Sequence, residues 1–112
     1  MTDFISQKCS HLSGDEHALN SKDTAQYLQQ LEPSWQLNTE TKSISHCYSF
    51  KNYYQTMAFV NVVAQIAHQQ DHHPDLSVSY NRCIVTYSTH SVNGLSINDF
   101  ICAAKINAAV QL

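Results

Sequence analysis

Histidines are the residues of this sequence whose types and spacing are best suited to chemistry. The chain has seven of them among 112 residues, and three lie in one short region: the adjacent pair His72 and His73, followed by His90. Imidazole titrates near neutral pH, so it can donate or accept a proton, and it also binds zinc readily. The cluster is therefore consistent with proton transfer, with metal ligation, or with histidines that have only a structural role.

The local sequence places the histidine pair on a rigid bend. Pro74 follows directly after His73 and disfavours helical geometry for it, so the imidazoles of His72 and His73 are expected to point in different directions. Adjacent side chains that diverge seldom chelate one metal ion together. Metal ligation is therefore the least favoured of the three interpretations, while proton transfer and a structural role both stay open at this point.

The helices and strands predicted in the first two thirds of the chain place this bend at the end of a long helix. A helix is predicted from Asn20, a good N-cap residue, to just before Pro33, and a first strand follows at 35–37. Residues 44–50 alternate in the period of a half-buried strand. From Asn52 the period becomes helical, with a broad apolar face. This long central helix must end before the proline that follows the histidine pair.

The third histidine belongs to the second half of the predicted sheet. A short strand is predicted around 78–80 and a longer one over 83–90, with a tight turn between them. The side chains of the longer strand that are expected to face the helices are Cys83, Val85 and Tyr87. The same alternation places His90 on the opposite face, at the strand end, where a ligand can reach it. Gly94 then breaks the chain, and a capping box at 96–99 opens a last helix.

Together these elements predict an α+β fold. Four antiparallel strands form one sheet, and three helices cover one of its faces, in the order α-β-β-α-β-β-α. A chain of 112 residues fits one such domain, which we place at residues 19–112. Residues 1–18 show no periodicity and predict a flexible N-terminal arm. The arm contains Cys9, His11 and His17, which leave a partial metal site as a minor alternative.

Composition narrows the classes of partner. The formal net charge is −3, and six Lys and Arg residues form no basic run, so nucleic-acid binding is not expected. The sequence has no apolar stretch long enough to span a membrane and no signal peptide, which favours a soluble, cytoplasmic protein with reduced cysteines. Charged residues make up 13% of the chain, below the ~25% usual for soluble domains, which suggests a surface hidden in an oligomer.

A longer set of motifs resembles the signature of the pterin-4a-carbinolamine dehydratases. The set comprises Asp71-His72-His73-Pro74-Asp75, Tyr80-Asn81, Ser88-Thr89-His90, Gly94-Leu95-Ser96 and Asp99. Similar residues also occur upstream, at Trp35, over 44–50 and over 50–59, so the resemblance covers roughly residues 19–108. The double-His-Pro and Thr-His elements at this separation are specific to that family.

The resemblance implies an enzyme that converts 4a-hydroxytetrahydrobiopterin to quinonoid dihydropterin and water, and so recycles the cofactor of aromatic amino acid hydroxylases. It implies a homodimer or homotetramer that uses no cofactor and no metal, because the pterin itself is the substrate. The residues that match the catalytic histidines of the family are His72, His73 and His90. The residues expected to contact the substrate are Asp71, Pro74, Ser88 and Thr89.

The resemblance does not assign separate roles to the three histidines, and the chemistry of imidazole gives our own assignment. We expect His72 and His90 to transfer protons and His73 to position the pterin, because imidazoles with a pKa near ~6.5 can serve as acid and base. Asp71 is expected to orient or charge-tune an imidazole.

Two positions depart from the family pattern. His68 lies one helical turn before His72, where many relatives carry an acidic residue, and Leu76 stands where an aromatic is frequent. These differences bear on the fine tuning of the site, and His68 is more simply a solvated helix residue. Because some animal members of the family also act as dimerisation cofactors of a transcription factor, a non-catalytic interaction module on the same scaffold is the main alternative.

Overall fold

Two β-hairpins form the sheet of this protein. The computed structural model describes residues 3–12, 16–31 and 34–110. The strands are β1 (Gln36–Asn38), β2 (Ser43–Ser49), β3 (Asp75–Val78) and β4 (Arg82–Tyr87). All neighbouring strands are antiparallel, and the order across the sheet is β1-β2-β4-β3. The two hairpins are therefore joined at the centre of the sheet, where β2 pairs with β4.

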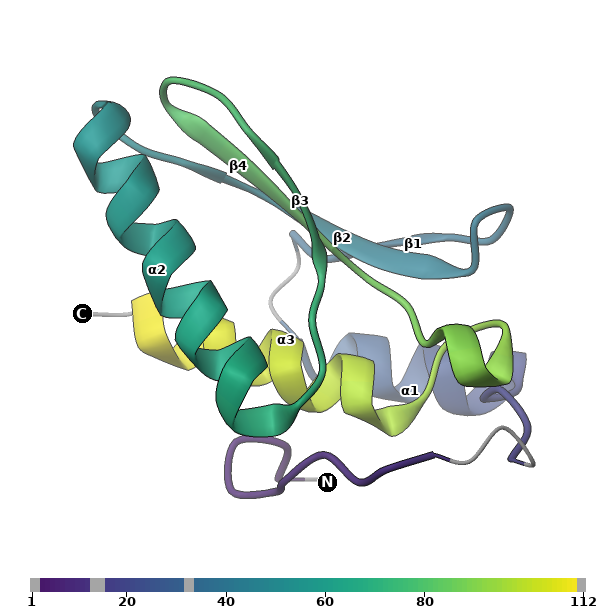
Figure 1. Cartoon of the computed structure of the whole chain (residues 1–112). Helices are drawn as coiled ribbons and strands as arrows, with labels where there is room; N and C mark the ends of the chain where they lie inside the picture. The colour runs from purple at the N-terminus through teal and green to yellow at the C-terminus, as the bar shows by residue number, and fades with distance from the viewer. Residues whose placement is uncertain (1–2, 13–15, 32–33, 111–112) are drawn as a thin grey trace.

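Three helices lie on one side of this sheet (Figure 1). They are α1 (Ser21–Gln29), α2 (Tyr53–Gln70) and α3 (Ile97–Val110), and a short 3₁₀ helix, η1 (His90–Val92), follows β4. The predicted α+β fold and its order of elements are thus confirmed. Within the described residues, no helix is long and apolar enough to cross a membrane.

Side-chain caps fix the starts of the first two helices. The Asn20 side chain accepts a hydrogen bond from the Asp23 N–H at 2.8 Å, and the Asn52 side chain accepts one from the Gln55 N–H at 2.9 Å. Each asparagine satisfies a donor that the first helical turn would otherwise leave free. Both caps are local, which is why the sequence predicts these two helix starts correctly.

The alternating pattern of β4 is confirmed by burial. Cys83, Val85 and Tyr87 are each 0% exposed and face the helices, whereas Ile84 between them is 41% exposed. Successive side chains of a strand point to opposite faces, so one face of β4 belongs to the core and the other is open. The open face carries Thr86, which lines the same cavity as the histidines described below.

Two strand boundaries differ from the sequence prediction. The strand predicted to run to His90 ends at Tyr87, because Thr89 pairs with Gly94 in an isolated bridge that folds the chain back on itself. His90 therefore begins η1 rather than ending a strand. The short strand predicted around 78–80 is found at Asp75–Val78, and Tyr80 lies in the following turn.

Helix α3 is the central element of the core. The sequence predicts one apolar side for it, but most of its length is enclosed. Its buried residues are Asn98, Asp99, Phe100, Ile101, Cys102, Ala103, Ala104, Ile106 and Asn107. The helix packs against α2 and is also covered by the N-terminal arm, so even polar side chains such as Asp99 lie away from solvent. This burial determines the electrostatics of the site described below.

The N-terminal arm packs against the helices. Phe4 is 3% exposed, and its ring contacts those of Tyr27 and Phe100 at centroid distances of 5.3 and 6.1 Å. The Lys105 ammonium also donates a hydrogen bond to the Ile5 carbonyl at 2.6 Å. Residues 3–10 therefore belong to the packed structure, unlike the loose arm that the sequence suggests. The domain boundary at residue 18 stays a prediction.

Candidate active site

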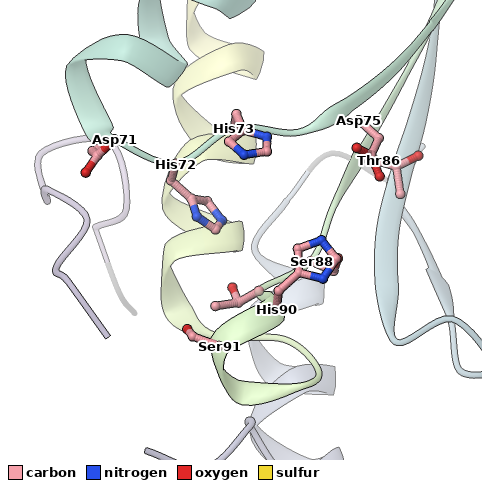
Figure 2. Close-up of a pocket in the computed structure, with 9 residues that line it drawn as sticks. Asp71, His72, His73, Asp75, Thr86, Ser88, His90 and Ser91 are labelled. Carbon is pink, nitrogen blue, oxygen red and sulfur yellow. The ribbon is translucent and has the colours of Figure 1, made fainter. Parts of the chain in front are cut away.

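The bend that carries the histidine pair begins at the end of α2. Asp71 caps the helix in the left-handed conformation, with φ of 52°, and the His72 N–H donates to the Ala67 carbonyl at 3.2 Å. Pro74 follows two residues later and leads the chain into β3. Both imidazoles of the pair extend from this bend to the lining of one cavity (Figure 2).

A cavity of about 180 Å³ opens between this bend and the segment that follows β4. Its lining residues are Asp71, His72, His73, Asp75, Thr86, Ser88, Thr89, His90 and Ser91. The structure therefore brings together six of the seven site residues expected from the sequence. Pro74 is the exception: it is half-buried and shapes the bend without lining the cavity.

His72 is held by a carboxylate from α3. Its Nε2 lies 2.7 Å from Oδ1 of Asp99, and the two side chains are 13% and 0% exposed. Because an ionised carboxylate only accepts hydrogen bonds, Nε2 carries the proton of this bond. Within the described residues, no other hydrogen bond to the His72 ring is found, so Nδ1 is left for a ligand.

The Asp99 carboxylate is satisfied on its other oxygen as well. Its Oδ2 accepts hydrogen bonds from the Thr89 hydroxyl at 2.8 Å and from the Ser96 N–H at 3.0 Å. The Thr89 and Ser96 hydroxyls also lie 2.7 Å from each other. A buried carboxylate is costly unless its lone pairs are satisfied, and these donors satisfy the Asp99 side chain beneath the cavity.

Opposing effects act on the pKa of His72. Burial alone would lower it, because a low-dielectric surrounding disfavours the charged imidazolium. The hydrogen bond and the negative charge of Asp99 outweigh burial, and the pKa of His72 is raised above its usual value of 6.5. The geometry therefore favours a protonated His72 at the cavity.

The orientation of the His72 ring is also fixed by stacking. Its plane lies nearly parallel to that of Tyr87, with an angle of 13° and a centroid distance of 5.6 Å. Tyr87 is fully buried, and burial raises the pKa of its hydroxyl, so the phenol stays neutral. One ring edge bonded to Asp99 and one ring face on Tyr87 leave His72 little freedom to rotate.

The other two histidines are accessible. His73 and His90 are both exposed, and Figure 2 shows them on facing sides of the cavity, one from the bend after α2 and one from η1. Asp71 lies at the edge of the group, with its carboxylate directed away from His73 and His90 (Figure 2). The site thus combines one oriented, half-buried imidazole with two solvent-exposed ones.

Asp99 is the residue that sequence reasoning missed. The carboxylate expected to tune an imidazole is Asp71, but Asp71 is exposed and acts on His72 through its charge alone, whereas Asp99 makes the hydrogen bond. The signal was present, because Asp99 belongs to the motif set and to the capping box. From the sequence, Asp99 is assigned only to the helix cap, so its hydrogen bond to His72 is not expected. Thr86 and Asp75, which line the cavity from β4 and β3, were likewise not expected in the site.

The described residues contain no group of three or more His, Cys, Asp or Glu side chains arranged to hold a metal ion. Proton transfer is the chemistry that the arrangement supports best: one imidazole with a raised pKa lies beside two accessible imidazoles around a small polar cavity.

Comparison with known proteins shows the family of the chain. The family model described as "Pterin 4 alpha carbinolamine dehydratase" matches residues 17–109. A protein of Nitrosomonas eutropha, named "Putative pterin-4-alpha-carbinolamine dehydratase", is 52% identical over 105 residues, which cover 94% of this chain and 91% of that protein. A protein of the same name from Legionella pneumophila strain Corby is 48% identical, with 95% and 94% covered.

Two solved structures are similar in fold. The crystal structure titled "transcriptional coactivator/pterin dehydratase" from Brucella melitensis superposes with a TM-score of 0.77 at 33% identity, covering 82% of this chain and 97% of that one. A pterin dehydratase-like protein described as a RuBisCO assembly factor in the alpha-carboxysome gives a TM-score of 0.60 at 19% identity, covering 70% and 90%. At that identity the second likeness concerns the fold alone.

Proposed function

The chain belongs to the pterin-4a-carbinolamine dehydratase family, and from this premise we propose that it dehydrates 4a-hydroxytetrahydrobiopterin by histidine acid/base catalysis. The observation that carries the proposal is the His72–Asp99 pair, which orients one protonated imidazole at a cavity that His73 and His90 also line. The substrate is the pterin itself, and the proposal includes no cofactor and no metal.

The reaction requires two proton transfers. The hydroxyl on carbon 4a must receive a proton to leave as water, and the neighbouring ring nitrogen must lose one so that the carbon–nitrogen double bond can form. Because its pKa is raised, His72 stays protonated to a higher pH than a free imidazole does, and its Nδ1–H is the free donor, so His72 serves as the acid. His90 faces the same cavity and serves as the base, while His73 positions the pterin.

The remaining polar groups complete the recognition of the substrate. Ser88, Asp71 and Asp75 offer hydrogen-bonding groups at the cavity wall, which suits a flat heterocycle with several ring N–H and amino groups. Thr89 lines the cavity too, but its hydroxyl already bonds to Asp99, so it acts on the substrate through the His72–Asp99 pair.

The wider role follows from the same proposal. Removal of the carbinolamine regenerates the cofactor of an aromatic amino acid hydroxylase, which is the functional partner we propose. We also propose a cytoplasmic homodimer or homotetramer, on the low charge content and the uncovered face of the sheet.

The test of the proposed activity is the lifetime of the carbinolamine in a hydroxylase reaction: catalytic amounts of this protein should shorten it. An unchanged lifetime would favour the interaction module instead.

A further inference from the structure

Two cysteines meet behind the active site. Cys9 in the N-terminal arm and Cys102 in α3 are 93 positions apart in sequence, and their Sγ atoms lie 3.5 Å apart. A disulfide requires an S–S distance of about 2.05 Å, so closing this gap takes a shift of between one and two ångströms, roughly, shared by two side chains. The other cysteines do not take part: Cys47 is exposed, and Cys83 is buried in β4.

The two thiols are not equivalent. Cys9 is half-buried and lines a cavity of about 490 Å³ on the arm side of His72, so a small molecule in this cavity can reach its sulfur. Cys102 is 0% exposed. An accessible thiol beside a buried one is the arrangement in which the first reacts with an oxidant and the second resolves the product.

The more accessible thiol, Cys9, is also the more acidic of the two. The hydrogen bond from Cys102 lowers the pKa of Cys9, and the charges of His72 and Lys105 lower it further, although burial opposes them. The same hydrogen bond, together with burial, raises the pKa of Cys102. Cys9 is therefore the more acidic thiol of the pair, so it forms the nucleophilic thiolate more readily than Cys102 does.

We propose that Cys9 and Cys102 are a peroxide-sensitive pair that forms a reversible disulfide between the arm and α3. The Cys9 thiolate attacks one oxygen of a hydroperoxide, the O–O bond breaks, and Cys9 becomes a sulfenic acid while hydroxide or alkoxide leaves. The Cys102 sulfur then attacks the Cys9 sulfur, the S–O bond breaks, and the hydroxyl leaves with the Cys102 proton as water. The two thiols are oxidised, the peroxide is reduced, and a thiol reductant reverses the change.

The surrounding contacts keep the pair aligned. The Ser10 N–H donates to the Asn98 side chain at 3.1 Å, and the Asn98 amide donates back to the Ser10 carbonyl at 2.8 Å. The Cys9 N–H donates to the Gln70 side chain at 2.8 Å. These hydrogen bonds hold the arm against α3 and α2. A disulfide would add a covalent link there and close a loop that runs from residue 9 to residue 102.

The experiment uses the full chain with Cys47→Ser, so that its exposed thiol cannot join two molecules; three cysteines remain. The protein is treated with hydrogen peroxide, unfolded, and alkylated, and its mass is measured before and after dithiothreitol. We expect two of the three thiols to escape alkylation, one cross-linked Cys9–Cys102 peptide after proteolysis, and full recovery of alkylation with dithiothreitol. The melting temperature of the oxidised protein should rise, because the cross-link restricts the unfolded chain.

Cys9→Ser in the same background is the matched control, since Cys9 is only half-buried and contributes little packing. Both of its remaining thiols should stay alkylatable at the same dose. Cys102→Ala should leave Cys9 as a sulfenic acid that dimedone traps. The proposal is overturned if peroxide leaves all three thiols alkylatable, carries Cys9 to sulfinic acid without a cross-link, or joins Cys9 to Cys83. None of these measurements depends on the dehydratase activity.

Discussion

Replacing Asp99 by Asn removes the charge that holds His72 in its protonated form, while keeping the size and shape of the side chain. The amide oxygen can still accept the hydrogen bonds from Thr89 and Ser96 that Oδ2 of Asp99 accepts in the wild type. The amide NH₂ then faces His72 Nε2 at the position where a carboxylate oxygen accepts a proton at 2.7 Å. A donor therefore meets a donor unless the imidazole gives up its Nε2 proton.

The size of the effect follows from the bond that is lost. A hydrogen bond to a charged group contributes roughly 1.5–3 kcal/mol. Each ~1.4 kcal/mol is a factor of ten, so the protonated form of His72 becomes about 10- to 100-fold less populated at a pH above its pKa. If His72 is the acid, the rate of dehydration in that pH range falls by about the same factor. Asp99 acts through His72 and is a positioning residue.

The assay is the pH profile of carbinolamine dehydration. In Asp99→Asn the limb that reports the protonated acid should shift to lower pH, and activity should partly return in more acidic buffer. Asp75→Asn is the matched control, because Asp75 lines the same cavity but makes no hydrogen bond to His72, and its profile should keep the position of the wild-type limb. An Asp99→Asn protein that is folded and has an unshifted profile refutes the role of the pair.

Four further predictions concern the histidines. His90→Ala should slow dehydration by ~10²–10⁴-fold, the range for a lost acid or base, with an unchanged melting temperature because His90 is exposed; a rate close to wild type would contradict this. His72→Ala should lose activity, and its free energy of unfolding in urea should fall by roughly 1–3 kcal/mol, because buried Asp99 is left without its His72 partner. A variant as stable as wild type would contradict the pairing of His72 with Asp99. The raised pKa of His72 contributes stability that is fully present below its unfolded pKa of about 6.5 and is lost as pH rises through the folded pKa. The difference in unfolding free energy between wild type and His72→Gln should therefore shrink from acidic to alkaline pH. A constant difference would show that the pKa is not raised. A chelator should leave both activity and stability unchanged, and zinc bound stoichiometrically at the histidines would overturn that expectation.

The structure changes what His72→Ala is expected to do. From the sequence, both His72 and His90 lie at an open rim with little packing to lose, so neither replacement should affect folding. That holds for His90, which is exposed in η1. It does not hold for His72, because its side chain is only 13% exposed and forms a pair with a fully buried carboxylate.

Features that depend on neighbours in sequence could be predicted. Asn20 and Asn52 cap helices through residues three positions ahead, and the alternation of Cys83, Val85 and Tyr87 is set by the period of a strand. Pro74 likewise acts on the residue directly before it. These are local effects of backbone geometry, and the sequence alone contains them.

Features that depend on distant packing could not be predicted. The His72–Asp99 pair joins residues 27 positions apart, and nothing in either segment indicates that the start of α3 lies under the end of α2. The packing of Phe4 against Tyr27 and Phe100 joins distant segments and has no periodicity to reveal it. The end of β4 at Tyr87 depends on a bridge between Thr89 and Gly94, which overrides a strand pattern that continues to His90.

Single-turnover dehydration of the carbinolamine tests the central claim most directly. The decay rate is compared among wild-type protein, each single variant His72→Gln and His90→Ala, and the double variant, with circular dichroism to confirm that each is folded. We predict fast decay with the wild type, decay close to the uncatalysed rate with the double variant, and a double-variant loss smaller than the product of the single losses, because the residues act as a unit. Equal decay with the folded wild type and the folded double variant would contradict histidine catalysis at this site.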